Sequence, residues 1–130
     1  MAITPSKTRA APTGNRLIVR VDLASGARIG PGKVALLEEI ARSGSISAAG
    51  RALRMSYRRA WELVEDLNKT LGVPVVSTAA GGSGGGGARL TEAGQAVVTE
   101  YRALQVAAEA AAAAHMTALE QAFAKRGAAE

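Results

Sequence analysis

The sequence predicts a mainly helical fold with a small β hairpin and a long C-terminal helix. Three observations favour it: apolar residues recur at helical spacing in two central segments, a glycine-rich stretch separates two short β-like runs, and an alanine-rich segment follows them. At 130 residues, the chain has room for one domain with one small core. The expected divisions are a flexible basic arm over 1–14, a globular domain over 15–90, a long helix over 91–126 and a tail over 127–130.

A half-buried β-strand is expected first, over residues 16–23. Apolar side chains occupy every second position from Leu17 to Leu23, which is the period-two pattern of a strand with one buried face. Ser25-Gly26 then predicts a turn.

The first predicted helix covers residues 33–42. Gly30-Pro31-Gly32 breaks the chain before it, and Ser43-Gly44 predicts its end. Its apolar stripe consists of Val34, Leu37 and Ile40 or Ala41.

A short helix, a turn and a third helix are expected between residues 45 and 71. Ser45 or Ser47 would cap the short helix, which runs through Leu53 and carries small residues that allow another helix to approach. Arg54-Met55 would form the turn, and Ser56 would cap the third helix, which Gly72 would end. The small residues are Ala48, Ala49 and Ala52, and the buried stripe of the third helix is Ala60, Val64, Leu67 and Leu71.

Two short strands, over residues 73–77 and 88–90, would flank the glycine-rich stretch 78–87, for which we expect a mobile loop. This stretch lacks the Gly-Lys-Ser or Gly-Lys-Thr of a nucleotide-binding P-loop, since Ala88-Arg89 follows it. Its backbone N–H groups, with Arg89 at its base, could instead follow a phosphate backbone.

Thr91 would cap a final helix that extends from about Glu92 to Lys125. Its apolar side chains alternate at spacings of four and three, as in a coiled coil, but most are alanines that bury little area. We therefore expect this helix to pack on a second subunit. The predicted dimer interface is Leu17, Val19, Val97, Tyr101, Leu104, Ala108, Ala111 and His115.

The formal net charge of +5 is unevenly distributed. Residues 42–61 contain five arginines and no acidic residue, and residues 1–28 contain five Lys or Arg against one Asp. The remaining segments are acidic on balance. Two gathered basic regions favour a polyanionic partner, although charge alone fits a solvated arginine-rich face equally well.

Several classes of protein are excluded or disfavoured. The chain has no Cys and one His, so it offers no thiolate nucleophile, no Cys-rich metal site and no multi-His cluster, and we expect no cofactor and no enzymatic activity. It has no apolar run long enough to span a membrane and no secretory signal, from which we expect a soluble, cytoplasmic protein without a membrane partner.

The order of the predicted elements, from strand through three helices and a hairpin to a last helix, is that of a winged helix-turn-helix. Its third helix would begin with the exposed residues Tyr57, Arg58 and Arg59, which suits insertion into the major groove of double-stranded DNA. Trp61 could contact a base or sugar, or be partly buried against the preceding turn. The predicted DNA-binding residues are Ser45, Ser47, Arg51, Arg54, Ser56, Tyr57, Arg58, Arg59, Trp61, Glu62, Ser83, Gly84, Gly85 and Arg89.

Over residues 16–105 the sequence resembles the N-terminal DNA-binding domain of ModE-type molybdate-dependent transcriptional regulators. The Ser-Tyr-basic-x-Ala-Trp opening of the third helix and the glycine-rich wing are specific to the resemblance, whereas the serine-rich second helix is shared with LysR-type winged helices. The resemblance implies a homodimer whose third helix reads DNA. Nothing after Leu104 resembles the molybdate-binding domains of such regulators. The segments that carry the resemblance are Gly44–Ala49, Ser56–Trp61, Leu67-Asn68, Gly81–Ala88 and Leu90–Gly94.

Together these features predict a homodimeric transcriptional regulator on a palindromic operator, with a role in molybdenum or related oxyanion homeostasis implied by the resemblance alone. The alternative is a protein-interaction module whose C-terminal helix pairs with a separate ligand-sensing protein. The acid-free run of arginines favours the regulator.

Overall fold

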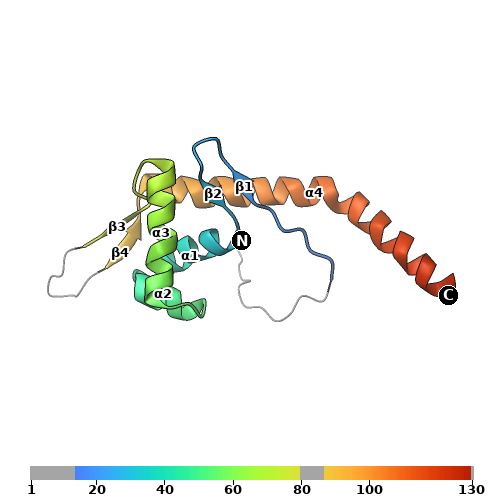
Figure 1. Ribbon diagram of the computed structural model, residues 1–130, viewed down its shortest axis with the longest axis horizontal. Helices are drawn as coiled ribbons and strands as arrows, with labels where there is room; N and C mark the ends of the chain where they lie inside the picture. Colours follow the sequence, from blue (N-terminus) through green and yellow to red (C-terminus); the bar gives the residue numbers. More distant parts are fainter. Residues whose placement is uncertain (1–13, 80–86, 130) are drawn as a thin grey trace. The chain divides into compact units, whose positions relative to one another are not determined.

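The computed structural model describes residues 14–79 and 87–129, with side chains described through residue 124. Two compact units are present: Val19–Arg102, and the described residues of Met1–Ile18 with Ala103–Glu130. The fold is mainly helical with small two-stranded sheets and a long C-terminal helix, as predicted (Figure 1). In chain order the elements are β1 (Val21–Asp22), β2 (Arg28–Ile29), α1 (Pro31–Ser43), α2 (Ile46–Ala52), α3 (Tyr57–Leu71), β3 (Val76–Thr78), β4 (Ala88–Leu90) and α4 (Glu92–Ala129).

The predicted first strand is shorter than expected. Only Val21 and Asp22 pair, with Ile29 and Arg28 of β2, a strand that the sequence analysis missed. The predicted alternation is nonetheless present before β1, where Val19 is half-buried and its neighbours are exposed, but Leu23 is exposed where burial was expected. A strand needs a hydrogen-bonded partner as well as an alternating pattern, and residues 15–20 have no partner strand within the described parts of the chain.

An exposed ion pair lies at the start of this hairpin. The Arg20 guanidinium donates two hydrogen bonds to the Asp22 carboxylate, at 2.9 and 2.8 Å. These hydrogen bonds hold the pKa of Asp22 below its ordinary value.

Helix α1 forms the centre of the core of the first unit. It begins at Pro31, earlier than predicted, because proline has the backbone angle of a first helical turn and lacks an N–H that would stay unpaired there. Gly44 ends it in the left-handed conformation, with φ of 73°. Leu36 is buried beside the predicted stripe, whereas Ala41 is exposed.

Helices α2 and α3 are capped as predicted. The hydroxyl of Ser45 accepts a hydrogen bond from the Ala48 N–H, and that of Ser56 accepts one from the Arg59 N–H, each at 3.0 Å. Ala60, Val64 and Leu67 of α3 are buried, and Leu71 is half-buried.

The two helices approach most closely at Gly50, which the sequence analysis did not single out. A Cβ atom there would lie 3.3 Å from the Met55 carbonyl oxygen and 3.5 Å from the Ala60 Cβ. Of the three alanines expected to allow this approach, Ala49 is buried, Ala48 is half-buried and Ala52 is exposed. The prediction for Ala52 is wrong because this residue lies on the outer face of a short helix.

Strands β3 and β4 form the wing, which Figure 1 shows beside α3. Val76 pairs with Leu90 and Thr78 with Ala88, so the first strand of the hairpin begins later than predicted. Val73 is exposed, and Pro74 has no N–H for a ladder. The predicted mobility of the glycine-rich loop concerns mostly residues 80–86, which lie outside the described residues.

The first turns of α4 are tied to the rest of the first unit. Thr91 caps the helix, since its hydroxyl accepts from the Gly94 N–H at 3.0 Å and donates to the Pro74 carbonyl at 2.7 Å. The Tyr101 hydroxyl donates to the Val19 carbonyl at 2.6 Å. Arg102 forms two hydrogen bonds to Glu38 of α1, at 2.8 and 2.7 Å.

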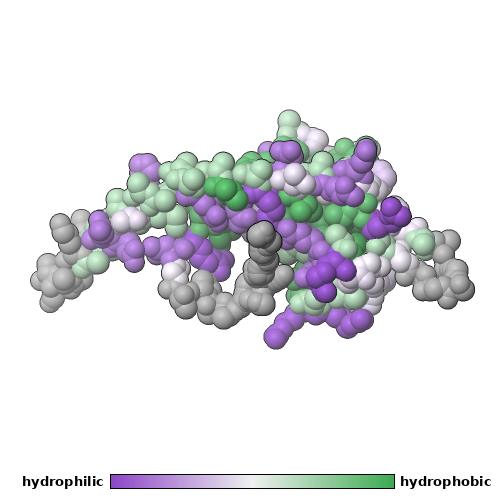
Figure 2. Space-filling model, turned by 180° about the vertical axis from the view of Figure 1, so that it is seen from behind, coloured by the Kyte–Doolittle hydropathy of each residue, from purple (hydrophilic) through white to green (hydrophobic). Residues whose placement is uncertain are grey.

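The second unit contains the rest of α4, which continues beyond the predicted end at Lys125. Large apolar side chains are exposed along it, and Figure 2 shows pale green apolar atoms among the purple polar ones on this helical stretch. Asn15 donates a hydrogen bond to Glu120 at 2.9 Å. No helix in the described ranges is both long and apolar enough to cross a membrane. The exposed apolar residues are Leu104, Val106, Leu119 and Phe123.

Candidate nucleic-acid interface

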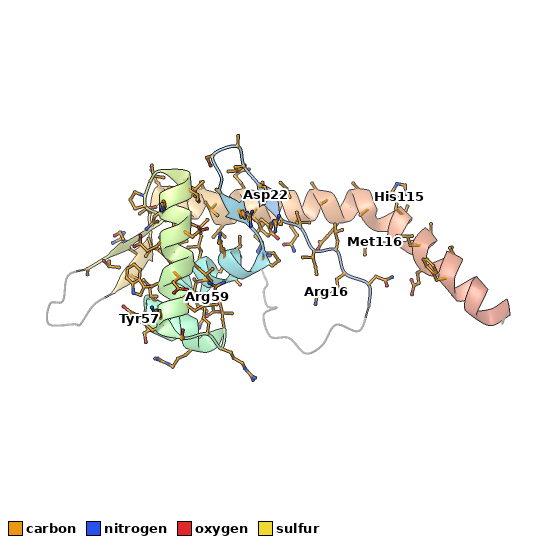
Figure 3. All side chains as sticks on the ribbon, in the orientation of Figure 1. Arg16, Asp22, Tyr57, Arg59, His115 and Met116 are labelled. Carbon is orange, nitrogen blue, oxygen red and sulfur yellow. The ribbon has the colours of Figure 1, made fainter. Side chains whose placement is uncertain are left out.

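The first turns of α3 have a charged face on one side and an apolar face on the other. Figure 3 labels Tyr57 and Arg59 at this end of the helix, next to α2. Tyr57 is 56% exposed, and the side chains of Arg58 and Arg59 are 88% and 60% exposed. On the opposite face Ala60 is fully buried. The helix is therefore fixed along one side and offers the other to a partner.

Local contacts hold this end of α3 in place. The Ser56 cap pairs one of the N–H groups that a helix leaves unpaired at its start. The tight approach at Gly50 fixes the separation of α2 from α3. Between them Arg54 adopts a left-handed conformation with φ of 60°, which turns the chain sharply.

The surface around these turns is strongly basic. Arg51 donates to the Ser47 hydroxyl at 3.0 Å, and within the described part of the chain neither Arg51 nor Arg54 has a carboxylate partner. Arg89, on β4 at the base of the wing, is exposed and pairs in register with Ser77. We define the α3 surface as Arg51, Arg54, Tyr57, Arg58, Arg59 and Glu62.

Glu62 is the acidic member of the α3 surface. Its carboxylate lies 3.6 Å from the Nε of Arg58 and 3.5 Å from an Nη of Arg59. The three side chains lie within one turn of the same helix, so they reach one another without help from any other element.

Two aromatic side chains flank the charged group. The rings of Tyr57 and Trp61 meet edge to face, with centroids 6.4 Å apart and an interplanar angle of 79°. Trp61 is half-buried and packs against the core, and contact of this residue with DNA stays a prediction. Tyr57 is free to meet a partner through its exposed edge.

The predicted serines and wing residues divide into two groups. The hydroxyls of Ser45 and Ser56 act as helix caps, and that of Ser47 accepts from Arg51, so all three have structural partners. The residues at the tip of the predicted wing lie outside the described residues; they are Ser83, Gly84 and Gly85.

A hydrogen bond that the sequence analysis missed joins the wing to the helices. The Ala88 N–H donates to the Gly44 carbonyl at 2.9 Å, so the base of β4 is attached to the end of α1. The signal available in the sequence was Gly44 itself, whose left-handed conformation turns its carbonyl toward the hairpin.

The residues of the predicted dimer interface differ in their burial within the protomer, and the interface itself stays a prediction. Tyr101 is only 3% exposed and belongs to the core of its own protomer, and Val97 packs against that core. Leu17, Val19 and Ala108 are half-buried. Leu104, Ala111 and His115 are exposed, and their place in a dimer stays a prediction.

The three helices, the tight turn between α2 and α3, and the β3–β4 hairpin define a winged helix-turn-helix domain with a basic recognition surface. Residues 32–95 match the family described as bacterial regulatory helix-turn-helix protein, lysR family. This part of the chain is therefore similar to LysR-type helix-turn-helix domains, and it is also similar to ModE and Mop proteins. The predicted resemblance is thereby confirmed.

Two relatives illustrate the relationship. The molybdenum-pterin-binding protein MopB of Rhodobacter capsulatus is 49% identical over 81 residues, which are 62% of this chain and 30% of MopB. The DNA-binding transcriptional dual regulator ModE of Escherichia coli K12 is 41% identical over 71 residues, which are 55% of this chain and 27% of ModE. The match thus covers less than a third of either relative.

A solved structure has the same fold. The chain aligns with the crystal structure of the CbnR_DBD-DNA complex with a TM-score of 0.53 and 23% identity, over 67% of this chain and 95% of that one. This likeness confirms the predicted winged helix-turn-helix architecture.

Proposed function

We propose that the chain regulates transcription as a homodimer that binds a palindromic operator through α3 of each subunit. The observation that carries this proposal is the division of α3, which buries Ala60, Val64 and Leu67 while Tyr57 and Arg58 stay exposed at its start. A helix of this kind fits the major groove, where base edges present distinct patterns of donors and acceptors.

The arginines of the α3 surface would supply affinity for any duplex by displacing counterions from phosphates. Arg51 lies in the last turn of α2, and Arg54 lies in the turn that connects α2 to α3. Arg89 lies at the base of the wing. Tyr57 and Arg58, at the start of α3, would contact base edges. Phosphate contacts would thus orient the domain, and α3 would select the sequence.

Exposed apolar residues support the homodimer. Leu104, Leu119 and Phe123 lie on the part of α4 in the second unit, where their side chains are 40%, 60% and 65% exposed. Full burial of a residue of this size gains about 1.5–3 kcal/mol, and burial of the exposed part of each would supply a share of that, which favours pairing with a second copy. Two recognition helices on a twofold axis would meet half-sites about 34–36 Å apart.

The names of the relatives support a role in molybdenum or related oxyanion homeostasis, exercised in the cytoplasm, where the operator would be. The chain spans less than a third of these relatives, so the signal is proposed to reach it through a ligand-sensing segment or a separate sensor protein.

The experiment is selection of random duplex DNA by the purified chain, followed by binding of the selected duplex across a salt series. We expect a palindromic sequence whose affinity falls steeply with salt. If footprinting of the selected duplex shows protection without twofold symmetry, the dimer is contradicted. Weak binding without any enrichment would instead support the module that pairs through α4 with a separate sensor protein.

A substitution within α3 refines the test. Arg58→Ala should weaken binding to the selected duplex by about 1–3 kcal/mol and relax the preference at one base pair, if the guanidinium reads a base edge. A uniform loss across all sequences would identify Arg58 as a phosphate contact.

A further inference from the structure

Glu62 is an unexpected residue for a surface that binds a polyanion. It is the one acidic residue in the first two turns of α3, and no acidic residue occurs between Arg42 and Trp61. Its side chain is 54% exposed and lies on the same face as those of Arg58 and Arg59.

Stability does not explain its position. The two ion pairs of Glu62 are long, at 3.6 and 3.5 Å, and the arginine side chains are 88% and 60% exposed. Pairs of this kind contribute little to the stability of a fold, because water screens them and the long side chains lose rotational freedom. The ion pairs therefore give Glu62 little part in the stability of the fold.

Two consequences follow when a duplex approaches. Arg58 and Arg59 must leave Glu62 before they can pair fully with phosphates, and the freed carboxylate is repelled by the negative backbone. Both effects weaken binding to every sequence alike. In the major groove a carboxylate regains a favourable contact only where a base presents an amino group, and the cytosine N4 amino group is the usual donor to glutamate.

We propose that Glu62 is a specificity-determining residue, which weakens binding to duplexes of arbitrary sequence and accepts a hydrogen bond from the amino group of a cytosine in each half-site. This inference rests on the proposed function. It assigns to the operator a C·G pair that faces the second turn of α3.

The test compares Glu62→Gln with Glu100→Gln in the full chain. Glu100 is exposed on a different helix, α4, so its substitution changes the net charge equally without altering a residue of the α3 surface. Affinity is measured for the duplex selected by the unaltered chain and for a random-sequence duplex at one salt concentration. Thermal unfolding verifies that both variants fold.

We expect Glu62→Gln to bind the random duplex several-fold more tightly than Glu100→Gln does, and to lower the ratio of selected to random affinity by about tenfold or more. Repeated selection with Glu62→Gln should shift the preference at one position of each half-site from cytosine toward adenine, because a glutamine amide both donates and accepts hydrogen bonds.

Two results would overturn the proposal: an unchanged ratio of selected to random affinity, or a selected half-site without a C·G pair. Each is distinguishable from failure of the proposed function, in which the unaltered chain itself would enrich no sequence.

Discussion

The two parts of α4 differ in what stabilises them. Residues 92–102 are held by their own protomer, through the Thr91 cap, the buried Tyr101 and the pairing of Arg102 with Glu38. Residues 103–124 expose most of their side chains, including Leu119 and Phe123. One continuous helix thus combines a segment built into a core with a segment whose apolar side chains still face water.

This difference shows that helical pattern and helical packing are separate properties. Both parts have apolar side chains at spacings of three and four, but only the first has neighbours in the first unit that exclude water from them. A helix that buries little area is marginal alone, so the second part gains most from a partner.

The largest expected effect on stability concerns residues 92–102, the first part of α4. A Cβ at Gly94 would lie 2.1 Å from the Val75 carbonyl oxygen, which belongs to the backbone and cannot swing away. Gly94→Ala should therefore lower the free energy of unfolding by about 3 kcal/mol or more, measured by urea denaturation. The control is Gly32→Ala on α1, where a Cβ would meet nothing within 4 Å. Equal stability of the two variants would contradict the close packing of this turn.

The next effect concerns the hydroxyl of Tyr101. Tyr101→Phe keeps the ring in the core but removes the 2.6 Å hydrogen bond to the Val19 carbonyl. We expect a loss of about 1 kcal/mol in the free energy of unfolding, measured by urea denaturation. Unchanged stability would show that this hydrogen bond contributes nothing to the fold.

A smaller effect is expected at the boundary between the two parts. Glu38→Gln would remove the charge that pairs with Arg102, and both side chains are 38% exposed. The loss should be about 0.5 kcal/mol at low salt, because a two-bonded but partly solvated pair is screened. Denaturation in about 1 M salt should abolish the difference. A loss that persists there would indicate a packing role for Glu38.

The smallest effect on stability is expected in the second part. Leu119 is 60% exposed, so Leu119→Ala should change the unfolding free energy of the protomer by less than about 0.5 kcal/mol. The same variant should raise the dissociation constant of the proposed dimer about tenfold or more, measured by sedimentation. Gln121→Ala, on a different face of the same turn, is the control. Equal dissociation constants for the two variants would remove Leu119 from the interface.

Much of the fold could be predicted because its signals are local. A serine or threonine before an apolar run predicted the caps at Ser45, Ser56 and Thr91, and glycine predicted the end of α3 at Gly72. These signals depend on the backbone of a few adjacent residues, so they do not depend on the tertiary structure of the rest of the chain. The exposed arginines of α3 were predictable for the same reason.

The errors concern contacts between residues far apart in the chain. The helical spacing of Tyr101 predicted a seam position but gave no sign of the Val19 carbonyl, 82 positions away, which accepts a hydrogen bond from the Tyr101 hydroxyl. The importance of Gly50 was missed because nothing in its own helix shows that Ala60 will lie against it. Spacing identifies an apolar face but not the surface that covers it.

The left-handed conformation of Arg54 has a consequence for engineering. An L-residue there brings its Cβ close to a carbonyl oxygen, which costs about 1–2 kcal/mol that glycine avoids. The turn between α2 and α3 therefore keeps an arginine at a position where glycine would adopt the same backbone conformation without this cost. A chain redesigned for heat resistance would exchange this arginine first, and that same exchange would remove one of the positive charges that face the proposed operator.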